Sequence, residues 1–457
     1  MEVHNLAEFV GNASFEQLSE EAVDQLKIRL LDSLGTAIGA VEGPPVQAIR
    51  NMIEDFGGNE ISTMVGGGKT TPDRAALYNS ALVRYLDFND SYLAKGETCH
   101  PSDNIGSILA VGEDAGISGK DFLTALAVAY QVQCRLSDEA PVRDKGFDHT
   151  TQGSYAVAAG VSKALGLDDD QTANAIAISG TALNALRVTR TGALSNWKGL
   201  AYPHTAFGGT HAALLAKYGI TGPPAVFEGN KGFMDAIAGE FSIDWKNEDL
   251  ERVTRTIIKK YNAEIHSQSS IEGMMELMDK HDIEADDVES IDIEIFDVAY
   301  HIIGGGEEGD KTIVRFKEEA DHSLQYMVSA ALLDGQVLPA QYKQERIEAD
   351  DIQSLLKRVK VSPKQEYSDR FPDEMPTTLT VQLKNGDTHS INKKDYEGFH
   401  TRPASWETII EKFENLAEPY TSVDLREQII EMVQDFENYS VSELMDLLKN
   451  VKLKAEN

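Results

Sequence analysis

Two histidines stand at predicted helix beginnings, where a neutral imidazole can take a proton. His100 is followed by a proline, and the run Asp87 to Ser91 precedes it across a glycine-containing loop. His149 is followed by two threonines and a run of small residues that predicts a helix. The positive backbone end of a helix lowers the pKa of a nearby imidazole and favours its neutral form, which can act as a general base near neutral pH. The alternative is that both histidines are structural, with the preceding acid and hydroxyl acting only as caps.

The chain also contains one long stretch without aspartate or glutamate. It runs from Gln171 to Phe227, in a sequence with 75 such residues among 457. At the average density of the chain it would hold about nine acids. Its basic and titratable residues are Arg187, Arg190, Lys198, Lys217, His204 and His211. A positive region on an acidic protein suits an anionic ligand. The alternative is a buried pair of small-residue helices with no room for charge.

Two lysines are placed to hold a carboxylate. Lys198 lies between a tryptophan and a glycine, ahead of a predicted alanine-rich helix. Lys259 lies in the segment 258–268, at a predicted domain boundary, and ligand sites favour such boundaries. A lysine acts there as a point charge, although a Lys-Lys pair alone is more typical of a solvated surface. The sequence has no Walker loop, no HExxH and no GxSxG motif, and no metal-ligand spacing.

The overall charge is strongly negative and restricts the classes of partner. The formal net charge is −33 and the isoelectric point is near 4.6. The acids are dispersed over predicted helix surfaces, so phosphates would meet the wrong sign over most of the protein, which argues against nucleic acid as a partner. A dispersed acidic shell keeps a protein soluble in high salt, so we predict a halophilic source.

Membrane and export signals are missing from the sequence pattern. No apolar run approaches the ~18 residues that a membrane span requires, and residues 1–17 lack a basic, apolar leader pattern. We therefore expect a soluble, cytoplasmic protein. Cys99 and Cys134 are the only cysteines, and in the cytosol they are expected to be free thiols. Two thiolates are too few for an iron–sulfur cluster or a Cys₄ zinc site.

The pattern of apolar residues predicts a helical region followed by a region of mixed strands and helices. Residues 1 to about 265 predict helices, over 23–40, 74–88, 104–115, 119–136, 155–165, 170–182 and 206–218. Beyond about residue 267, alternation predicts strands over 288–298, 359–361 and 377–383, a hairpin turn at Asn385-Gly386 leading to 389–391, and helices over 323–333 and 350–356. The tail, 406–451, returns to helix. We predict a mainly α protein with a smaller α+β domain, divided into 1–266, 267–402 and a helical return at 403–457.

Six segments together resemble the MmgE/PrpD family. They are LLDSLGTAIGA at 30–40, YLDFNDS and HPSDNIG within 85–106, DHTTQGSYAVAAGVSKALGLD at 148–168, SNWKGLAYPHTAFGGTHAALLA at 195–216, ADHSLQYMVSAALLDG at 320–335 and RPASWETIIEKF at 402–413. They follow the family's order and span essentially the whole chain. The family includes 2-methylcitrate dehydratase, cis-aconitate decarboxylase and iminodisuccinate epimerase. The resemblance implies a large helical domain with an α+β lid, a homodimer, an active site in the cleft between domain and lid, and no metal or organic cofactor.

The resemblance also implies which residues act. The catalytic positions of the decarboxylase branch fall here on Asp87, His100, His149, Lys198 and Lys259. Ser91 occupies the hydroxyl position after the aspartate, and we assign substrate binding to Ser91, Arg187, Arg190, Tyr261 and His266. The sequence departs from the family pattern twice. The usual K-x-[FY]-P-A reads KKYNA at 259–263, without the proline, and a lid tyrosine of the decarboxylases has no clear counterpart before Asp321.

The segment AEIHSQ at 263–268 is closer to the AEFHSQ of the dehydratases, so we predict that branch. The predicted reaction removes water from a tricarboxylate, most directly 2-methylcitrate to 2-methylaconitate in the methylcitrate cycle of propionate breakdown. The two lysines, with an arginine, would hold the carboxylates and stabilise developing charge. One histidine would take the proton, and the other histidine or Asp87 would orient it or protonate the leaving hydroxyl. The rival predictions are decarboxylation of cis-aconitate to itaconate, epimerisation of a small polycarboxylate, and an inactive binding scaffold.

Overall fold

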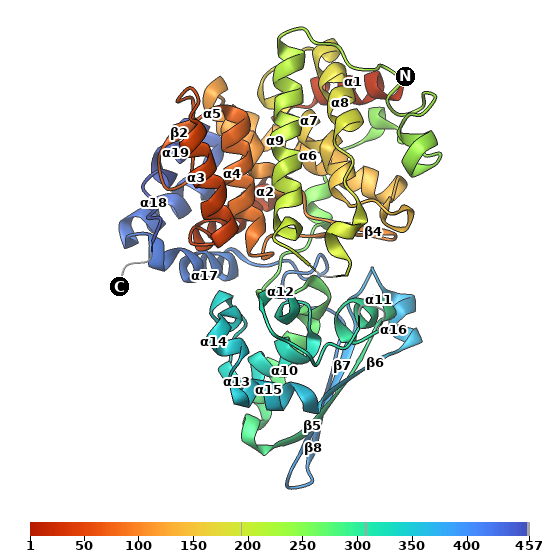
Figure 1. The fold of residues 1–457 in the computed structure, drawn as a ribbon, viewed down its shortest axis with the longest axis vertical. Helices are drawn as coiled ribbons and strands as arrows, with labels where there is room; N and C mark the ends of the chain where they lie inside the picture. Colours follow the sequence, from red (N-terminus) through yellow and green to blue (C-terminus); the bar gives the residue numbers. More distant parts are fainter. Residues whose placement is uncertain (193, 307–308, 455–457) are drawn as a thin grey trace. The chain divides into compact units, whose positions relative to one another are not determined.

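The computed structural model describes residues 1–192, 194–306 and 309–454 and divides the chain into two compact units (Figure 1). Unit 1 consists of Met1–Ile257 with Ser405–Asn457, and unit 2 of Ile258–Ala404. Helices form most of unit 1, and unit 2 carries the main sheet, so the predicted fold class is confirmed. The last residues of the predicted helical return, 455–457, lie outside the described part of the chain.

The first boundary between the units follows Ile257, whereas the sequence pattern placed it after residue 266. The backbone N–H of Ile258 donates to the carbonyl of Gly398 at 2.9 Å. The hydroxyl of Tyr396 donates to the carbonyl of Ile258, also at 2.9 Å. These bonds attach the segment after Ile257 to unit 2. Their partners lie about 140 positions further along the chain, so no local pattern marks them.

Unit 1 is built from twelve α-helices in the described residues. Their bounds are α1 Glu2–Asn12, α2 Glu20–Gly39, α3 Pro44–Phe56, α4 Pro72–Tyr85, α5 Ile105–Ala115, α6 Gly119–Glu139, α7 Thr150–Ala164, α8 Asp169–Ala182, α9 Trp197–Lys217, α17 Trp406–Ala417, α18 Val423–Gln434 and α19 Val441–Leu448. Two antiparallel strand pairs join them, β1 Ser62–Thr63 with β2 Lys69–Thr70, and β3 Tyr92–Ala94 with β4 Glu97–Cys99. The C-terminal helix α17 packs against α2, so the two ends of the chain build one unit.

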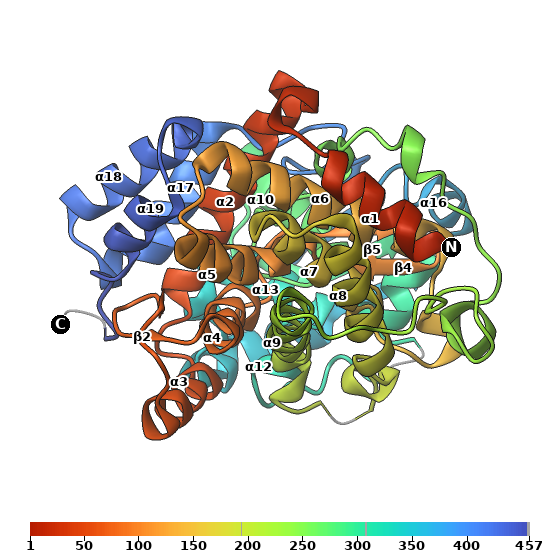
Figure 2. The same ribbon diagram turned by 90° about the horizontal axis from the view of Figure 1, so that it is seen from above.

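Helix α9 begins nine residues earlier than the predicted start at 206. The predicted start lies after Pro203, and proline lacks an N–H and disfavours a helix interior. Proline nevertheless lies inside α9 and is buried there with Tyr202 and Thr205, so burial of this face outweighs the local preference. Figure 2 looks nearly along α9 and shows α4, α7 and α8 around it. Lys198 is therefore in the first turn of a helix instead of ahead of one.

Glycine permits a close approach between α7 and α9. A Cβ at Gly153 would lie 2.5 Å from the ring of Tyr202, closer than side-chain carbons pack. Because Gly153 has none, the Tyr202 ring reaches the beginning of α7, where it stacks on His149 with 6.2 Å between ring centroids. Helix packing thus brings the start of α7 beside the first half of α9.

Unit 2 contains a four-stranded mixed sheet in the order β6-β5-β7-β8. Its strands are β5 Val288–Ile295, β6 Val359–Pro363, β7 Thr377–Leu383 and β8 Thr388–Lys393. The predicted hairpin at Asn385-Gly386 joins β7 and β8, and Gly386 has the positive φ of 94° that this turn requires. The helices are α10 Gln268–His281, α11 Asp297–Ala299, α12 Lys317–Ala320, α13 Leu324–Asp334, α14 Gln344–Ile347, α15 Asp350–Leu355 and α16 Gln365–Arg370. The sequence pattern did not predict α10, which packs on β7 and β8.

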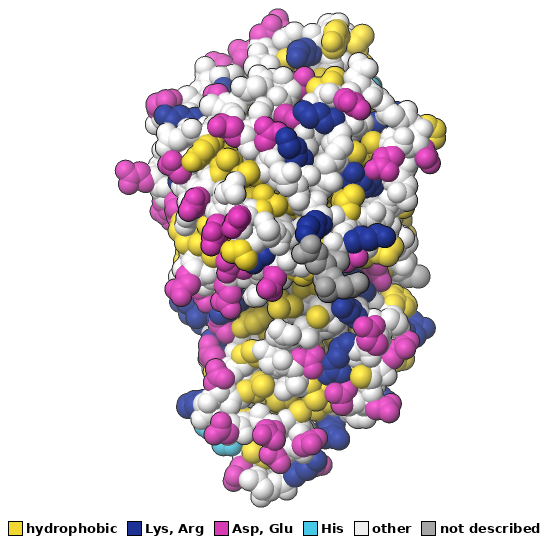
Figure 3. Space-filling view, turned by 90° about the vertical axis from the view of Figure 1, so that its left-hand side faces the viewer, with side chains coloured by type: hydrophobic (Ala, Val, Ile, Leu, Met, Phe, Trp, Pro, Cys, Tyr) yellow, Lys and Arg dark blue, Asp and Glu magenta, His cyan; other side chains and the backbone are white. Residues whose placement is uncertain are grey.

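The acidic residues are spread over the surface, as the sequence predicted. On the face shown in Figure 3, aspartates and glutamates alternate with lysines and arginines and do not gather in one patch. In the described part of the chain, no helix has both the length and the apolar composition of a bilayer-crossing segment.

Candidate active site

Four of the five predicted catalytic residues lie in unit 1, on four separate segments. Asp87 follows α4, and His100 lies between β4 and the 3-10 helix Pro101–Asn104. His149 directly precedes α7, and Lys198 is the second residue of α9. The ammonium nitrogen of Lys198 lies 3.6 Å from Oδ2 of Asp87, and the rings of the two histidines are 5.5 Å apart between centroids. Tertiary packing therefore pairs the lysine with the aspartate and the two histidines with each other.

Asp87 has a backbone conformation that few residues adopt. Its φ is +55°, in the left-handed region, which is uncommon for a residue other than glycine and is stabilised only by the surrounding structure. Arg84, one turn earlier on α4, donates to Oδ1 of Asp87 at 2.6 Å. The two oxygens of this carboxylate thus lie on two different cations, Arg84 and Lys198.

The hydrogen bonds of His100 define which ring nitrogen carries the proton. Nδ1 lies 2.7 Å from the carbonyl oxygen of Asp90 and 3.1 Å from Oγ of Ser91. A carbonyl oxygen can only accept, so Nδ1 is the donor, and in the neutral ring the lone pair is on Nε2. The carboxylate of Asp90 in turn accepts from Ser102 and Tyr130, which fixes the loop. Nε2 of His100 is therefore the basic atom that this arrangement prepares.

His149 is a buried, neutral imidazole. Burial lowers its pKa to about 3, against the opposing effect of Asp148, and the nearby arginines lower it further. Its Nε2 is 3.8 Å from Oδ1 of Asp148, and neither ring nitrogen has a hydrogen-bond partner within residues 1–192, 194–306 and 309–454. The sequence argument attributed a neutral histidine to the helix beginning, whereas desolvation is the larger cause here. A neutral ring with an unpaired N–H can donate to a substrate oxygen.

The histidines adjoin a set of ion-paired side chains that we call the charged cluster. It consists of Arg84, Asp87, Asp103, Asp148, Arg187, Arg190 and Lys198. Four cations meet three carboxylates in it. Burial also raises the pKa of Asp103 to about 7, with Arg84 opposing, so about half of this carboxyl is protonated near neutral pH. The charged cluster therefore has an excess of positive charge that an anionic ligand would neutralise.

The acids of the charged cluster come from outside the acid-free stretch and balance its arginines. Nε and Nη2 of Arg190 lie 2.7 and 3.3 Å from the two oxygens of Asp148, and Nη1 of Arg187 lies 3.7 Å from that carboxylate. Arg190 also donates to the carbonyl of Lys198 at 3.1 Å. Both arginines were predicted to bind substrate, and the structure shows that they hold Asp148 at the start of α7.

Sequence reasoning missed Arg84, Asp103 and Asp148 as members of this site. Asp148 directly precedes His149, and Asp103 follows His100 by three residues, so both stood inside the segments already singled out. The available signal was the charge imbalance. A run with four cations and no acid needs acids from elsewhere when it is buried, because an unpaired buried charge is costly.

Replacing Asp148 by asparagine should destabilise unit 1 strongly. Asp148 is fully buried beside two half-buried arginines, and its removal would leave these cations without their carboxylate. We expect the free energy of unfolding to fall by about 3–5 kcal/mol, measured by urea denaturation. The matched control is Asp446→Asn, whose carboxylate pairs with Lys449 but is 68% exposed. That change should cost less than about 1 kcal/mol, and similar losses for both variants would contradict the buried pairing.

The buried imidazole of His149 should make stability depend on pH. The unfolded chain binds this proton below pH 6.5, whereas the folded chain does so only near pH 3. Lowering the pH across that window therefore favours the unfolded chain, by about 1.4 kcal/mol per pH unit. His149→Asn should remove this contribution between about pH 6.5 and 5.5, in urea titrations kept above the isoelectric point. Asp103→Asn should change the slope in the opposite sense, because the folded pKa of Asp103 is raised and its contribution is lost as pH rises toward 7. Parallel pH profiles for wild type and both variants would contradict these assignments.

The remaining predicted residues, Lys259, Tyr261 and His266, belong to unit 2. Lys259 is buried, and burial raises the pKa of Tyr261. Nδ1 of His266 lies 2.7 Å from Oε1 of Glu264, whose other oxygen accepts from the backbone N–H of His266. Although burial opposes it, the charge of His266 lowers the pKa of Glu264 to about 2. This carboxylate orients the imidazole, with the ring held against Phe296 and Phe371.

Fold and site together define a class of protein: a two-unit, mainly helical protein with buried histidines beside a cation-rich cluster. Family models agree with this description. The MmgE/PrpD N-terminal domain matches residues 4–246 and the MmgE/PrpD C-terminal domain matches residues 261–438. The chain belongs to the MmgE/PrpD family.

Curated relatives match over nearly the whole chain. A 2-methylcitrate dehydratase of Salmonella typhi is 27% identical, over 98% of this chain and 96% of its own length. The mitochondrial 2-methylcitrate dehydratase of Yarrowia lipolytica is also 27% identical, over 97% and 89%. A cis-aconitate decarboxylase of Mus musculus is 25% identical, over 99% and 94%. The identities to the two kinds of enzyme differ by too little to choose between them.

Proposed function

We propose that this protein is a lyase that removes water from a tricarboxylate, with 2-methylcitrate as the first candidate substrate. The proposal rests on the basic Nε2 of His100. The hydrogen bond from Nδ1 to the Asp90 carbonyl places the lone pair of the neutral ring on Nε2, and an excess of cations lies in the same site. Relatives named 2-methylcitrate dehydratase and a relative named cis-aconitate decarboxylase match this chain almost equally well. The segment at 263–268, which is closer to the dehydratase sequence than to the decarboxylase sequence, supports the dehydratase.

His100 is the proposed general base. Its Nε2 takes a proton from the carbon next to a carboxylate, and negative charge then develops on that carboxylate as an enolate forms. Lys198 is the proposed cation for this charge, because its ammonium is buried in the first turn of α9, 3.6 Å from Oδ2 of Asp87 and in the same cluster as the histidines. His149 has a pKa too low for an efficient base and instead donates its N–H to a substrate oxygen.

The departing hydroxyl also needs a proton, and Asp87 is the proposed group that delivers or relays it. The carboxyl of Asp103, whose pKa burial raises to about 7, is a second proton carrier in the charged cluster and lies 3.7 Å from Nε of Arg84. Lys259 remains the proposed second carboxylate anchor, and Tyr261 and His266 remain proposed substrate contacts. The scheme balances as loss of one C–H proton and one hydroxide, released together as water with formation of a carbon–carbon double bond.

Proton NMR on the purified protein distinguishes this function from its rivals. Incubation with 2-methylcitrate should give the signals of 2-methylaconitate, whereas cis-aconitate should not yield itaconate. Carbon dioxide release from cis-aconitate would instead favour the decarboxylase, which the mouse relative supports. Exchange of a C–H proton with deuterium from solvent, without water loss, would indicate an epimerase. Binding of tricarboxylates without any turnover would leave only the scaffold.

We further infer that the protein is adapted to high salt, from its net charge of −33. Mutual repulsion of the acids destabilises the folded chain, and salt screens it, with a Debye length of about 10 Å at 0.1 M and about 3 Å at 1 M. The thermal midpoint should therefore rise between about 0.1 M and 2 M KCl, measured by circular dichroism. A midpoint that falls over this range would contradict the inference, and the NMR assay is best run in molar KCl.

A further inference from the structure

A second set of buried charges adjoins the loop that carries Asp87. It consists of Arg29 and Asp32 on α2, Asp90 in the loop and Lys412 on α17, and we call it the support set. Each of the four residues is at most 6% exposed. Two cations are combined with two carboxyl groups, so the support set lacks the excess of positive charge found in the charged cluster. Such a set is suited to holding structure rather than to binding an anionic substrate.

Lys412 connects the C-terminal helix α17 to this loop. Its ammonium nitrogen lies 2.6 Å from Oδ1 of Asp32 and donates to the carbonyl oxygen of Phe88 at 2.8 Å. The same nitrogen lies 3.7 Å from the centroid of the Phe88 ring, which is within the range of a cation–π contact. Phe88 is fully buried and directly follows Asp87. Burial raises the pKa of Asp32 and Lys412 opposes the rise, so the lysine also favours the carboxylate form of its partner.

The carbonyl that Lys412 holds lies between the two groups proposed to handle protons. It belongs to Phe88, one residue after Asp87 and two residues before Asp90. The Asp90 carbonyl in turn accepts from Nδ1 of His100 at 2.7 Å. Asp87 also has a φ of +55°, which the surrounding structure must maintain. A displaced Phe88 carbonyl would therefore turn the Asp87 carboxylate and move the acceptor that orients His100.

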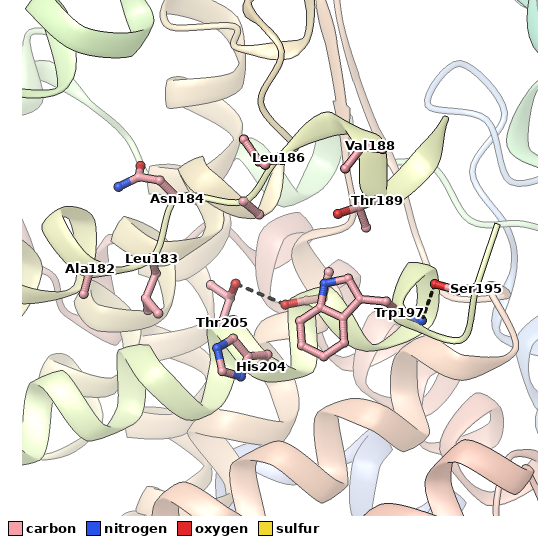
Figure 4. A pocket seen from close by; sticks show the side chains of 12 residues that line it. Ala182, Leu183, Asn184, Leu186, Val188, Thr189, Ser195, Trp197, His204 and Thr205 are labelled. Atoms are coloured by element: carbon pink, nitrogen blue, oxygen red, sulfur yellow. Dashed lines mark hydrogen bonds between the residues drawn. The ribbon is translucent and has the colours of Figure 1, made fainter. Parts of the chain in front are cut away.

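The lysine side of the pair formed by Asp87 and Lys198 borders open space. A pocket of about 440 Å³ lies beside the first turn of α9, and its lining includes Leu186, Val188 and Trp197 (Figure 4). Trp197, next to Lys198, is 46% exposed. Packing therefore restrains this turn less tightly than a filled interior would. The geometry of the pair depends correspondingly more on the loop that carries Asp87.

We propose that Lys412 is a positioning residue of the active site. Its ammonium holds the Phe88 carbonyl, and through this loop it fixes the Asp87 carboxylate and the imidazole of His100. The inference rests on the proposed function, in which these two groups carry protons. Lys412 acts through the backbone of the loop and is not assigned any contact with the substrate. The alternative role is purely structural, in which the lysine only joins α17 to α2 through Asp32.

Steady-state kinetics with two matched lysine variants tests the proposal. Lys27 on α2 is the control, because it is 8% exposed, lies 3.1 Å from Oε2 of Glu437 and donates to the carbonyl of Gln434 at 2.8 Å. Lys412→Met should lower kcat for 2-methylcitrate by about 10²-fold with KM within about threefold, because displacement of a reacting group by about 1 Å has an effect of this size. Lys27→Met should leave kcat within about twofold of wild type. Equal effects of the two changes on kcat would show that Lys412 has no positioning role.

Asp32→Asn separates positioning from stability. Lys412→Met leaves the buried Asp32 carboxylate without its ammonium, so the urea midpoint of unfolding should fall by about 1 M or more. Adding Asp32→Asn removes that unpaired charge and should recover part of the midpoint but none of kcat. Asp32→Asn alone keeps the bond from Lys412 to Phe88, so kcat should stay within about threefold of wild type. A kcat that follows the urea midpoint across these variants would leave only a structural role and would overturn the proposal.

Hydrogen exchange tests the hold on the loop without any turnover. The amide of Ser91 donates to the carbonyl of Ile257 at 2.8 Å, and exchange of this amide reports opening of the loop. Peptides that cover 87–91 should exchange about tenfold faster or more in Lys412→Met and in the double variant, but at the wild-type rate in Lys27→Met. Unchanged exchange in Lys412→Met would contradict the proposal. Loss of protection in a protein that turns over no tricarboxylate would instead refute the proposed lyase function and leave the positioning of the loop by Lys412 supported.

Discussion

His100→Asn should lower kcat for tricarboxylate turnover by about 10²- to 10⁴-fold with little change in KM. The amide of asparagine can still donate to the Asp90 carbonyl, as Nδ1 of His100 does at 2.7 Å, so the loop is expected to keep its conformation. What the variant loses is the basic Nε2. The measurement is steady-state kinetics with 2-methylcitrate, combined with a urea titration to show that the variant is folded.

The control for this variant is His4→Asn, which removes an exposed histidine on α1 and should leave kcat unchanged. A second check uses deuterium. If His100 takes the proton, the variant should also lose exchange of the substrate C–H with solvent by the same factor. Retention of kcat within threefold of wild type would exclude His100 as the base and would shift that role to another group of the site.

Lys198→Met should lower kcat/KM by about 10²- to 10³-fold. Methionine keeps the length and apolar stem of the lysine but removes the charge that would meet the developing enolate. It also leaves the ion pair between Asp87 and Arg84 in place. Arginine at this position should restore only part of the activity, because a planar guanidinium does not place its charge where a compact ammonium does.

Lys217→Met is the matched control, since it makes the same change at the exposed end of the same helix. It should leave kcat/KM within about twofold of wild type. Equal and small effects of the two lysine variants would mean that Lys198 has a structural role, holding Asp87, and that the carboxylate anchors lie elsewhere.

The tertiary structure balances much of the positive charge of the acid-free stretch, residues 171–227. As a sequence feature it predicted a cationic island for an anionic ligand. In the fold, the buried Lys198 and the half-buried Arg187 and Arg190 pair with Asp87, just after α4, and Asp148, just before α7, so much of their charge is balanced.

Local sequence patterns predicted most helices and strands because amphipathic spacing is a short-range property. They placed α2, α6 and α8 and the β7–β8 hairpin close to their observed positions. They failed where tertiary contacts outweigh local preference. Burial continues α9 through Pro203, and hydrogen bonds to Gly398 and Tyr396 draw the segment after Ile257 into unit 2.

The sequence alone determined the family, the fold class and a short set of candidate residues, because these depend on residue types in a fixed order. It could not determine how the candidates are protonated or paired. The proton on Nδ1 of His100 follows from a backbone carbonyl ten positions earlier, and the neutral state of His149 follows from desolvation by packed helices. The carboxylates that pair with Arg190 and Lys198 come from segments 42 or more positions away. Charge state and pairing depend on distances and on burial, and only the tertiary structure sets those.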